Sequence, residues 1–448
     1  MGLSEGSPPA ALPSSPTAPM RGSPELPQVG WSVEHTLAQL DLLRIADVRW
    51  KDGRAFSLAY LASPEAHDLA TEAYRRFSGE NALNVEAFPS LRTMQSDILS
   101  MVSGWLSAPP TARGFFTSGG TESILMAMKA ARDQFRHDET RPIRQPNVVL
   151  PTSAHAAFHK AAAYFDIELR LVPVCSETWR ADASAMANAA NDDTIMFVAS
   201  APQYPQGVVD PVSDIAAVAQ ERGVNCHVDA CMGGVTLPYL ERLGVAVPRW
   251  NFVIDGVTSM SVDLHKFGYA AKGASVIMYR TARLRSHQGF VTDQWLGGVY
   301  GSSGVLGTKS GGAIAAAWAV MHHIGDDGYL RLTKAARDTT LAIAAAINDD
   351  PRLVLRAQPN ATLLSFGAAP QPVGDSAATS SPIDIFAVAD GLAARGWYVD
   401  RQAPPPSVHL TVNAVHANTY ETFLADLNAV LDSVSNRRGS AGSYGTLE

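Results

Sequence analysis

The sequence has few cysteines, no long apolar run and no concentration of positive charge. Its three cysteines, Cys175, Cys226 and Cys231, have the spacing of neither a disulfide framework nor a metal site. No apolar run approaches the roughly 20 residues of a membrane-spanning helix. The formal net charge of −8 is spread along the chain, which argues against nucleic-acid binding. We therefore expect a soluble, cytoplasmic protein with no metal, no transmembrane segment and no nucleic-acid partner.

What the chain does contain changes along its length. Residues 1–30 are rich in Pro and Ser, and residues 435–448 in Gly and Ser, so we predict a disordered tail at each end. Residues 31–105 combine helical periodicity with polar loops and extended stretches. Residues 106–324 alternate short apolar runs with helical patterns, which predicts the large domain of an α/β protein. Residues 325–434 mix helices and strands in a smaller α+β domain.

The large domain is expected to contain a mostly parallel sheet with helices on both faces. We predict strands at 148–150, 168–172, 194–199, 225–230, 252–254, 259–263 and 274–279, and a strand or extended segment at 54–60. Ligands of such sheets bind at the carboxyl ends of the strands. Asp229 and the pair His265-Lys266 follow strands directly, so we expect a site there.

Lys266 lies at the centre of the stretch 261–273, SVDLHKFGYAAKG. It directly follows a histidine, and small residues and an apolar run come after it. A buried lysine is costly unless it is neutral, paired or covalently used. We predict that Lys266 forms a Schiff base with pyridoxal 5'-phosphate (PLP), the commonest covalent use of a lysine amine. A surface loop lysine is the alternative for a lone lysine.

Other residues offer the remaining groups that PLP needs. Asp229 can be the carboxylate that keeps the pyridine nitrogen protonated. His155 can stack on the pyridine ring. Gly119, Gly120 and Thr121 form a glycine-rich turn at a helix N-terminus, where backbone N–H groups can bind the phosphate. Taken singly, each residue could instead be a helix cap, a loop anchor or a surface residue.

Several stretches resemble the sphingosine-1-phosphate lyases, which belong with the group II amino-acid decarboxylases to the fold-type-I PLP enzymes. Besides 261–273, they are 117–127 (TSGGTESILMA), 202–211 (PQYPQGVVDP), 227–234 (HVDACMGG) and 295–300 (WLGGVY). The resemblance runs from about residue 45 to 330 and more loosely to about 430. It implies the fold-type-I PLP-dependent transferase fold, with a seven-stranded type of sheet in the large domain.

The resemblance also implies how the cofactor is held. Lys266 would be the Schiff-base lysine, with His265 beside the PLP phosphate, Asp229 at the pyridine nitrogen and His155 stacked on the ring. Thr308 matches a position, usually serine, that reaches the phosphate of the neighbouring subunit's PLP. The resemblance therefore implies a homodimer with its sites at the interface, to which residues 31–105 contribute.

Further matches concern the substrate. Tyr60 and Tyr300 match active-site tyrosines of substrate handling and proton transfer, and Lys272 matches a lysine that binds the substrate phosphate. Two positions depart from the family. Asn84 stands where many members have a phosphate-binding histidine, and an amide can donate a hydrogen bond but carries no charge. Lys309 replaces a usual arginine and loses its bidentate geometry.

The implied reaction is a retro-aldol cleavage of sphingosine 1-phosphate, or a similar phosphorylated sphingoid base, to a long-chain aldehyde and phosphoethanolamine. The base could be a tyrosine or a water molecule oriented by the PLP phosphate. Eukaryotic relatives carry a membrane anchor that this chain lacks, so a soluble, bacterial-type enzyme is expected.

Two alternatives remain beside the lyase. One is a PLP-dependent amino-acid decarboxylase with the same fold and lysine. Lys272 favours the lyase, because a cation six positions past Lys266 suits a phosphate group. The other is a non-catalytic PLP-binding or scaffold protein, against which the combination of Lys266, Asp229, His155 and the Gly-Gly-Thr turn argues.

Overall fold

A computed structural model describes residues 25–138, 145–370, 383–434, 437–442 and 445. Of the two predicted tails, residues 1–24 and half of 435–448 lie outside the described residues. No helix among these residues is both long and apolar enough to cross a bilayer.

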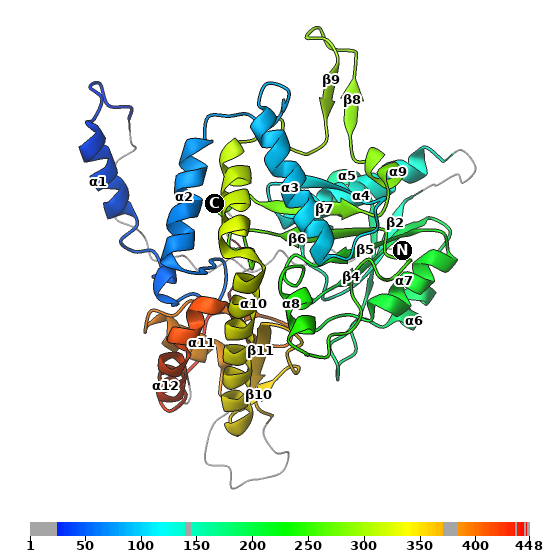
Figure 1. Cartoon of the computed structure of the whole chain (residues 1–448). Helices are drawn as coiled ribbons and strands as arrows, with labels where there is room; N and C mark the ends of the chain where they lie inside the picture. The colour runs from blue at the N-terminus through cyan, green and yellow to red at the C-terminus, as the bar shows by residue number, and fades with distance from the viewer. Residues whose placement is uncertain (1–24, 139–144, 371–382, 435–436, 443–444, 446–448) are drawn as a thin grey trace.

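The large unit is built on a seven-stranded sheet in the order β1-β7-β6-β5-β4-β2-β3 (Figure 1). The strands are β1 (Arg113–Thr117), β2 (Asn147–Pro151), β3 (Glu168–Val172), β4 (Thr194–Ser200), β5 (Asn225–Asp229), β6 (Ser259–Asp263) and β7 (Ser275–Tyr279). The pairs from β3 to β6 are parallel, whereas β7 runs antiparallel to both β6 and β1. The central strands are buried along their whole length, as a sheet covered on both faces requires. The predicted α/β fold with a mostly parallel seven-stranded sheet is confirmed.

Helices cover both faces of this sheet. They are α4 (Gly120–Arg136), α5 (Ala157–Phe165), α6 (Ala183–Ala189), α7 (Val212–Glu221), α8 (Thr236–Arg242) and α9 (Ala282–Ser286). Helices α4 and α7 both pack against β4 and β5 without packing against each other to a comparable extent, so they lie on opposite faces. Helix α4 begins directly after β1, which brings its N-terminus to the edge where the parallel strands end.

A long helix, α10 (Gly311–Asp349), connects the large unit to a smaller one. It is kinked at Gly325, whose φ of 61° and ψ of 176° are not helical. Its first part contributes Ile314 to the large core and its second part contributes Ile343 to the small core. Residue 325 is also where the sequence predicts the smaller domain to begin; the domain boundaries themselves stay a prediction.

The smaller unit contains a four-stranded antiparallel sheet in the order β10-β11-β13-β12. Its elements are β10 (Leu353–Leu355), β11 (Leu363–Ala368), α11 (Ile385–Ala393), β12 (Asp400–Gln402), β13 (Ser407–Thr411) and α12 (Tyr420–Leu431), with the 3-10 helix η2 (Ala414–Asn418). Its core is built around the buried rings of Phe366, Trp397 and Phe423. This agrees with the α+β pattern expected past the kink.

The N-terminal segment adds α1 (Val33–Leu43), the 3-10 helix η1 (Trp50–Asp52), α2 (Pro64–Arg76) and α3 (Pro89–Trp105). Ser32 and Ser63 cap α1 and α2, each accepting a hydrogen bond from a first-turn N–H, and Pro64 starts α2. Helices α2 and α3 pack on α10, but α1 buries no residue and stands apart from the body (Figure 1). The hairpin of β8 (Phe290–Thr292) and β9 (Tyr300–Ser302) also projects from it.

Two of the predicted strands are wrong or partly wrong. Residues 252–254 form turns, because the Asn251 side chain accepts a hydrogen bond from the Val253 N–H and reverses the chain. Residues 54–60 do not form a regular extended segment: Ala55 pairs in an isolated bridge with Tyr398, and the chain bends at residues 56–58, where Leu58 has a φ of 65°. The sequence analysis did not predict strand β1 of the large sheet, helices α6, α8 and α9, the hairpin, or β12.

Candidate active site

A cavity of about 370 Å³ lies at the carboxyl ends of the parallel strands. Each group in its lining follows one strand of the sheet. Gly119 to Thr121 follow β1, His155 follows β2, Tyr204 follows β4, Asp229 ends β5, and Asp263, His265 and Lys266 end β6 or follow it. The cavity is therefore where parallel α/β sheets place their ligands. The structure brings together the cofactor-binding residues predicted from a single chain.

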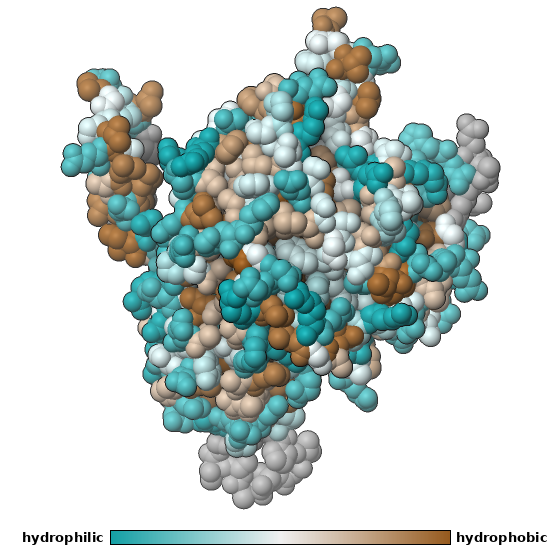
Figure 2. Space-filling view, viewed as in Figure 1, coloured by the Kyte–Doolittle hydropathy of each residue, from teal (hydrophilic) through white to brown (hydrophobic). Residues whose placement is uncertain are grey.

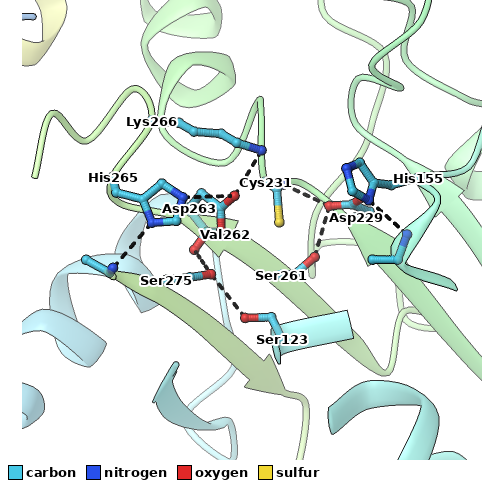
Figure 3. A network of polar contacts seen from close by, with 12 residues as sticks. Ser123, His155, Asp229, Cys231, Ser261, Val262, Asp263, His265, Lys266 and Ser275 are labelled. Carbon is cyan, nitrogen blue, oxygen red and sulfur yellow. Dashed lines mark hydrogen bonds and ion pairs between the residues drawn. The ribbon is translucent and has the colours of Figure 1, made fainter. Parts of the chain in front are cut away.

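Lys266 is paired with Asp263, a residue to which the sequence analysis gave no role. Lys266 Nζ lies 2.9 Å from Asp263 Oδ2, and Asp263 is 2% exposed (Figure 3). Burial alone would raise the pKa of Asp263, but the positive charge of Lys266, with a smaller effect of the neighbouring His265, outweighs burial and holds that pKa at about 2. Asp263 is thus a buried carboxylate facing the reactive amine. Its place three residues before Lys266, at the end of β6, was the available signal.

His265 is close to both Asp263 and the glycine-rich turn. Its Nδ1 accepts a hydrogen bond from the Ala274 N–H (3.3 Å), and its Nε2 is 3.7 Å from Asp263 Oδ2. Because Nδ1 accepts, the proton of the neutral ring is on Nε2, on the side of Asp263. Burial lowers the pKa of His265, although Asp263 opposes this. A Cβ at Gly119 would lie 3.5 Å from the His265 ring, so the two are neighbours.

The glycine-rich turn forms the N-terminus of α4 and opens on the cavity. A Cβ at Gly120 would lie 2.7 Å from Cys231 Sγ and 2.9 Å from Asp263 Oδ2, so only glycine lets the helix approach this closely. Gly120 and Thr121 are the first residues of α4, and their N–H groups have no carbonyl one turn earlier in the helix. Such an N-terminus is suited to bind a phosphate.

The other two cofactor residues lie beside each other on the far side of the cavity (Figure 3). Asp229 Oδ1 accepts hydrogen bonds from Ser261 Oγ and from the Cys231 N–H, both at 3.0 Å. His155 Nδ1 accepts from the Ala157 N–H at 3.1 Å, which fixes the ring. Burial lowers the pKa of His155 and favours its neutral form, although Asp229 opposes the shift. A neutral, flat ring next to a carboxylate suits a ring-stacking role.

These groups fit PLP. A lysine amine, a carboxylate, a flat ring and a helix N-terminus surround one cavity, and the missing Cβ of Gly120 lets that N-terminus lie close to Cys231 and Asp263. Among the described residues, no cluster of three or more His, Cys, Asp or Glu side chains could hold a metal ion.

Lys272 and Tyr60 lie next to the cavity but are not part of its lining as far as the chain is described. Lys272 Nζ donates to the His265 carbonyl (3.4 Å) and lies 5.0 Å from the centre of the Tyr60 ring. Although Lys272 is exposed, the surrounding protein desolvates its ammonium group, and with the charge of Lys266 this lowers its pKa to about 8.

Tyr300, Thr308 and Asn84 do not line the cavity of this chain in its described part. Tyr300 is in β9 of the projecting hairpin, and its hydroxyl lies 3.7 Å from where a Cβ at Gly307 would be, beside Thr308. Thr308 is exposed and accepts a hydrogen bond from Asn81 Nδ2 (3.4 Å). Asn84 is exposed too, and its Oδ1 accepts from the Glu86 N–H (3.0 Å). Their predicted roles stay predictions.

Tyr204 is a second residue whose place the sequence analysis missed. It lines the cavity, its hydroxyl donates to Asp400 of β12, and its ring packs on His409 of β13 with 4.0 Å between centroids. These contacts connect the smaller unit to the cavity. The stretch 202–211 drew attention to Tyr204, but its partners lie almost 200 residues further along the chain.

Comparisons with known proteins agree with this geometry. The family model of the pyridoxal-dependent decarboxylase conserved domain matches residues 41–369. A sphingosine-1-phosphate lyase of Dictyostelium discoideum is 36% identical over 94% of this chain and 76% of that protein. The structure of a Burkholderia pseudomallei sphingosine-1-phosphate lyase has a TM-score of 0.85 at 35% identity, covering 92% of this chain and 93% of that one. A Lactobacillus brevis glutamate decarboxylase has a TM-score of 0.80 over 94% and 96%, but its 18% identity shows the fold alone.

Proposed function

The chain belongs to the pyridoxal-dependent decarboxylase family and, within it, to the sphingosine-1-phosphate lyases, and from this premise we propose its reaction. It is a PLP-dependent aldehyde-lyase. Its substrate is sphingosine 1-phosphate or a similar phosphorylated sphingoid base, and its products are a long-chain aldehyde and phosphoethanolamine. The observation that carries this proposal is the likeness to lyases over nearly the whole chain, at a higher identity and coverage than the matching decarboxylase relative, which is 28% identical over 82% of this chain. The decarboxylase alternative is therefore less well supported.

Different residues around the cavity are proposed to bind different parts of PLP. When bound, PLP supplies an electron sink for the pair released as the carbon–carbon bond breaks. Lys266 would bind the aldehyde of PLP, and Asp229 would keep the pyridine nitrogen protonated. His155 would cover one face of the pyridine ring. The first N–H groups of α4 would bind its phosphate.

The substrate's own phosphate is proposed to bind at Lys272. Its ammonium is close to the cavity but outside its lining, so it can face a headgroup that extends beyond the cofactor. A lysine binds phosphate as a point charge. The base that takes the C3-hydroxyl proton stays open between a tyrosine and an oriented water. Tyr60, which adjoins the cavity, and Tyr300, if a second copy supplies it, are the tyrosines that we propose for that role.

A homodimer is the proposed working unit. The hairpin residues Val291, Leu296 and Val299 are 72–108% exposed, and α1 carries a row of exposed leucines (Figure 2). Apolar surfaces of this kind on projecting arms are typical of protein interfaces. The hairpin also carries Tyr300, so a second copy could bring it to a cavity that one chain leaves without it. Sparse, unpaired cysteines support a cytoplasmic location.

A substrate panel tests the proposal. The purified protein, loaded with PLP, is incubated with phosphorylated sphingoid bases, their unphosphorylated analogues and amino acids, and aldehyde and carbon dioxide are measured in parallel. We expect aldehyde from the phosphorylated bases and no carbon dioxide. Carbon dioxide from an amino acid, with the sphingoid bases left intact, would replace the lyase by the decarboxylase.

A further inference from the structure

A buried row of hydrogen bonds ends on Asp229. Ser259 Oγ is 2.9 Å from His227 Nδ1, His227 Nε2 is 3.3 Å from Ser261 Oγ, and Ser261 Oγ is 3.0 Å from Asp229 Oδ1. The sheet explains this order, because β5 and β6 are paired with His227 opposite Ser259 and Asp229 opposite Ser261. Residues two apart on a strand point to the same face, so the four side chains meet on one side of the sheet. Figure 3 shows its last contact, from Ser261 to Asp229.

All four residues are buried where apolar side chains would normally be. His227 and Ser261 are 0% exposed, Ser259 is 4% and Asp229 is 8% exposed. Burying polar groups costs free energy unless they are hydrogen-bonded. Here the groups satisfy one another, and the row ends at the cavity rather than within the core.

The row has one direction. A carboxylate only accepts, so Ser261 donates to Asp229, and its oxygen is left to accept from the Nε2–H of His227. With its proton on Nε2, the neutral ring accepts at Nδ1 from the Ser259 hydroxyl. Burial agrees with a neutral ring, since it lowers the pKa of His227 to about 4. Every donor therefore points towards Asp229, and hydrogen bonds in such a chain strengthen one another.

We propose that His227 and Ser261 are positioning residues that orient the Asp229 carboxylate towards the pyridine nitrogen and keep it ionised. Within the described residues, the hydrogen bonds to the Asp229 carboxylate both end on Oδ1, which anchors one oxygen and leaves the other to face the cofactor. The inference rests on the cofactor role of Asp229 in the proposed function, but not on the choice of substrate.

The test uses the holoenzyme without any substrate. Ser261→Ala and His227→Leu are compared with the parent for PLP affinity and for the pH at which the absorbance of bound PLP reports loss of the ring-nitrogen proton. Losing a hydrogen bond to a charged group corresponds to about tenfold weaker binding or more. We expect a PLP dissociation constant about tenfold higher and a titration shifted to lower pH in both variants.

Two further variants separate positioning from simple packing. The amide nitrogen of His227→Gln can still donate to Ser261, so it should recover most of the affinity and the titration. Ser365→Ala is the matched control, because Ser365 is fully buried in β11 of the other sheet, and it should change neither.

Parent-like PLP affinity and titration in Ser261→Ala would overturn the inference, even if its melting temperature fell. Should His227→Leu fail to fold, Ser261→Ala decides alone, since alanine fills nearly the same space. Because no substrate is used, the result is independent of whether the protein proves to be a lyase or a decarboxylase.

Discussion

The predicted site residues of this chain fall into two groups, those that line one cavity and those that lie on outlying segments. Around the cavity, Lys266, Asp229, His155 and Asp263 are held within one sheet, each at the end of a strand. Outside it, Tyr300, Thr308 and Asn84 lie on a projecting hairpin and exposed loops. The first group shares one cavity of this chain, whereas the described residues give the second group no common cavity.

This difference has a physical origin. Neighbouring strands of a sheet are only about 5 Å apart, so residues at their ends are brought together by backbone hydrogen bonds alone. A hairpin with exposed apolar residues has no comparable constraint, and a partner surface would determine where it lies. We infer that one chain supplies most of the cofactor site, and we propose that a second copy brings Thr308 and Tyr300 to it.

The strongest test of the first half of this comparison is Lys266→Ala. It removes the amine that would bind the cofactor, so turnover and the visible absorbance of lysine-bound PLP should both be lost. Lys160→Ala, on the exposed side of α5, is the control and should keep both. Full activity in Lys266→Ala would refute the central assignment.

Mixing two inactive variants tests the second half. Tyr300→Phe should be inactive if Tyr300 serves in catalysis, and Lys266→Ala is inactive for a different reason. If Tyr300 acts in the cavity of the partner, co-expression of the two variants should give some mixed dimers with one intact site and so restore part of the activity. No recovery, in mixed dimers that are shown to form, would place Tyr300 in the cavity of its own chain or outside the site.

Lys272→Ala probes the border between the two regions. Removing a charged hydrogen-bond donor should lower kcat/KM for phosphorylated substrates by about ten- to a hundredfold. Unphosphorylated analogues should be nearly unaffected. Lys272→Arg keeps the charge and is the control. Equal losses on both classes of substrate would contradict the phosphate role.

The lowered pKa of Lys272 leads us to expect a pH dependence of kcat/KM. Its pKa is lowered to about 8, so the ammonium is present below that pH and is lost as the pH rises through it. The values of kcat/KM for phosphorylated substrates, which report the free enzyme, should therefore fall above about pH 8. Lys272→Arg should remove this fall, because arginine stays charged. An identical alkaline limb in both proteins would assign it to another group.

The sequence was enough to predict the residues that would hold the cofactor, although not Asp263 or Tyr204, because several of them follow recognisable apolar strands. Asp229 and Lys266 could be placed at strand ends from the runs at 225–230 and 259–263 alone, and β5 and β6 confirm those runs. The strand predicted at 252–254 was wrong because an apolar run of three residues is too short to distinguish a strand from a turn. The side chain of Asn251, which reverses the chain there, acts on the triplet from outside it.

Contacts between distant segments were beyond such a prediction. The contact of Tyr204 with Asp400 joins two units of the fold, and no local pattern announces it. The pair of Asp263 and Lys266 is closer in sequence, but it forms only because the chain turns after β6 and buries the carboxylate. Periodicity predicts which residues are buried, whereas pairing of buried charges depends on the packed structure.

Asn84→His is expected to have the smallest effect and would sharpen the comparison at its outer edge. Asn84 is exposed, and its Oδ1 accepts a hydrogen bond from the Glu86 N–H. Its side chain is an uncharged amide at the position where the family resemblance implies a histidine. A histidine with an ordinary pKa of about 6.5 adds charge only in mildly acidic solution. If Asn84 lies at the substrate phosphate of a dimer, the variant should lower KM a few-fold near pH 6, with no change above pH 8. Asn84→Gln, which stays neutral, is the control. If KM stays lower at high pH, the shape of the side chain rather than its charge determines substrate binding at this position.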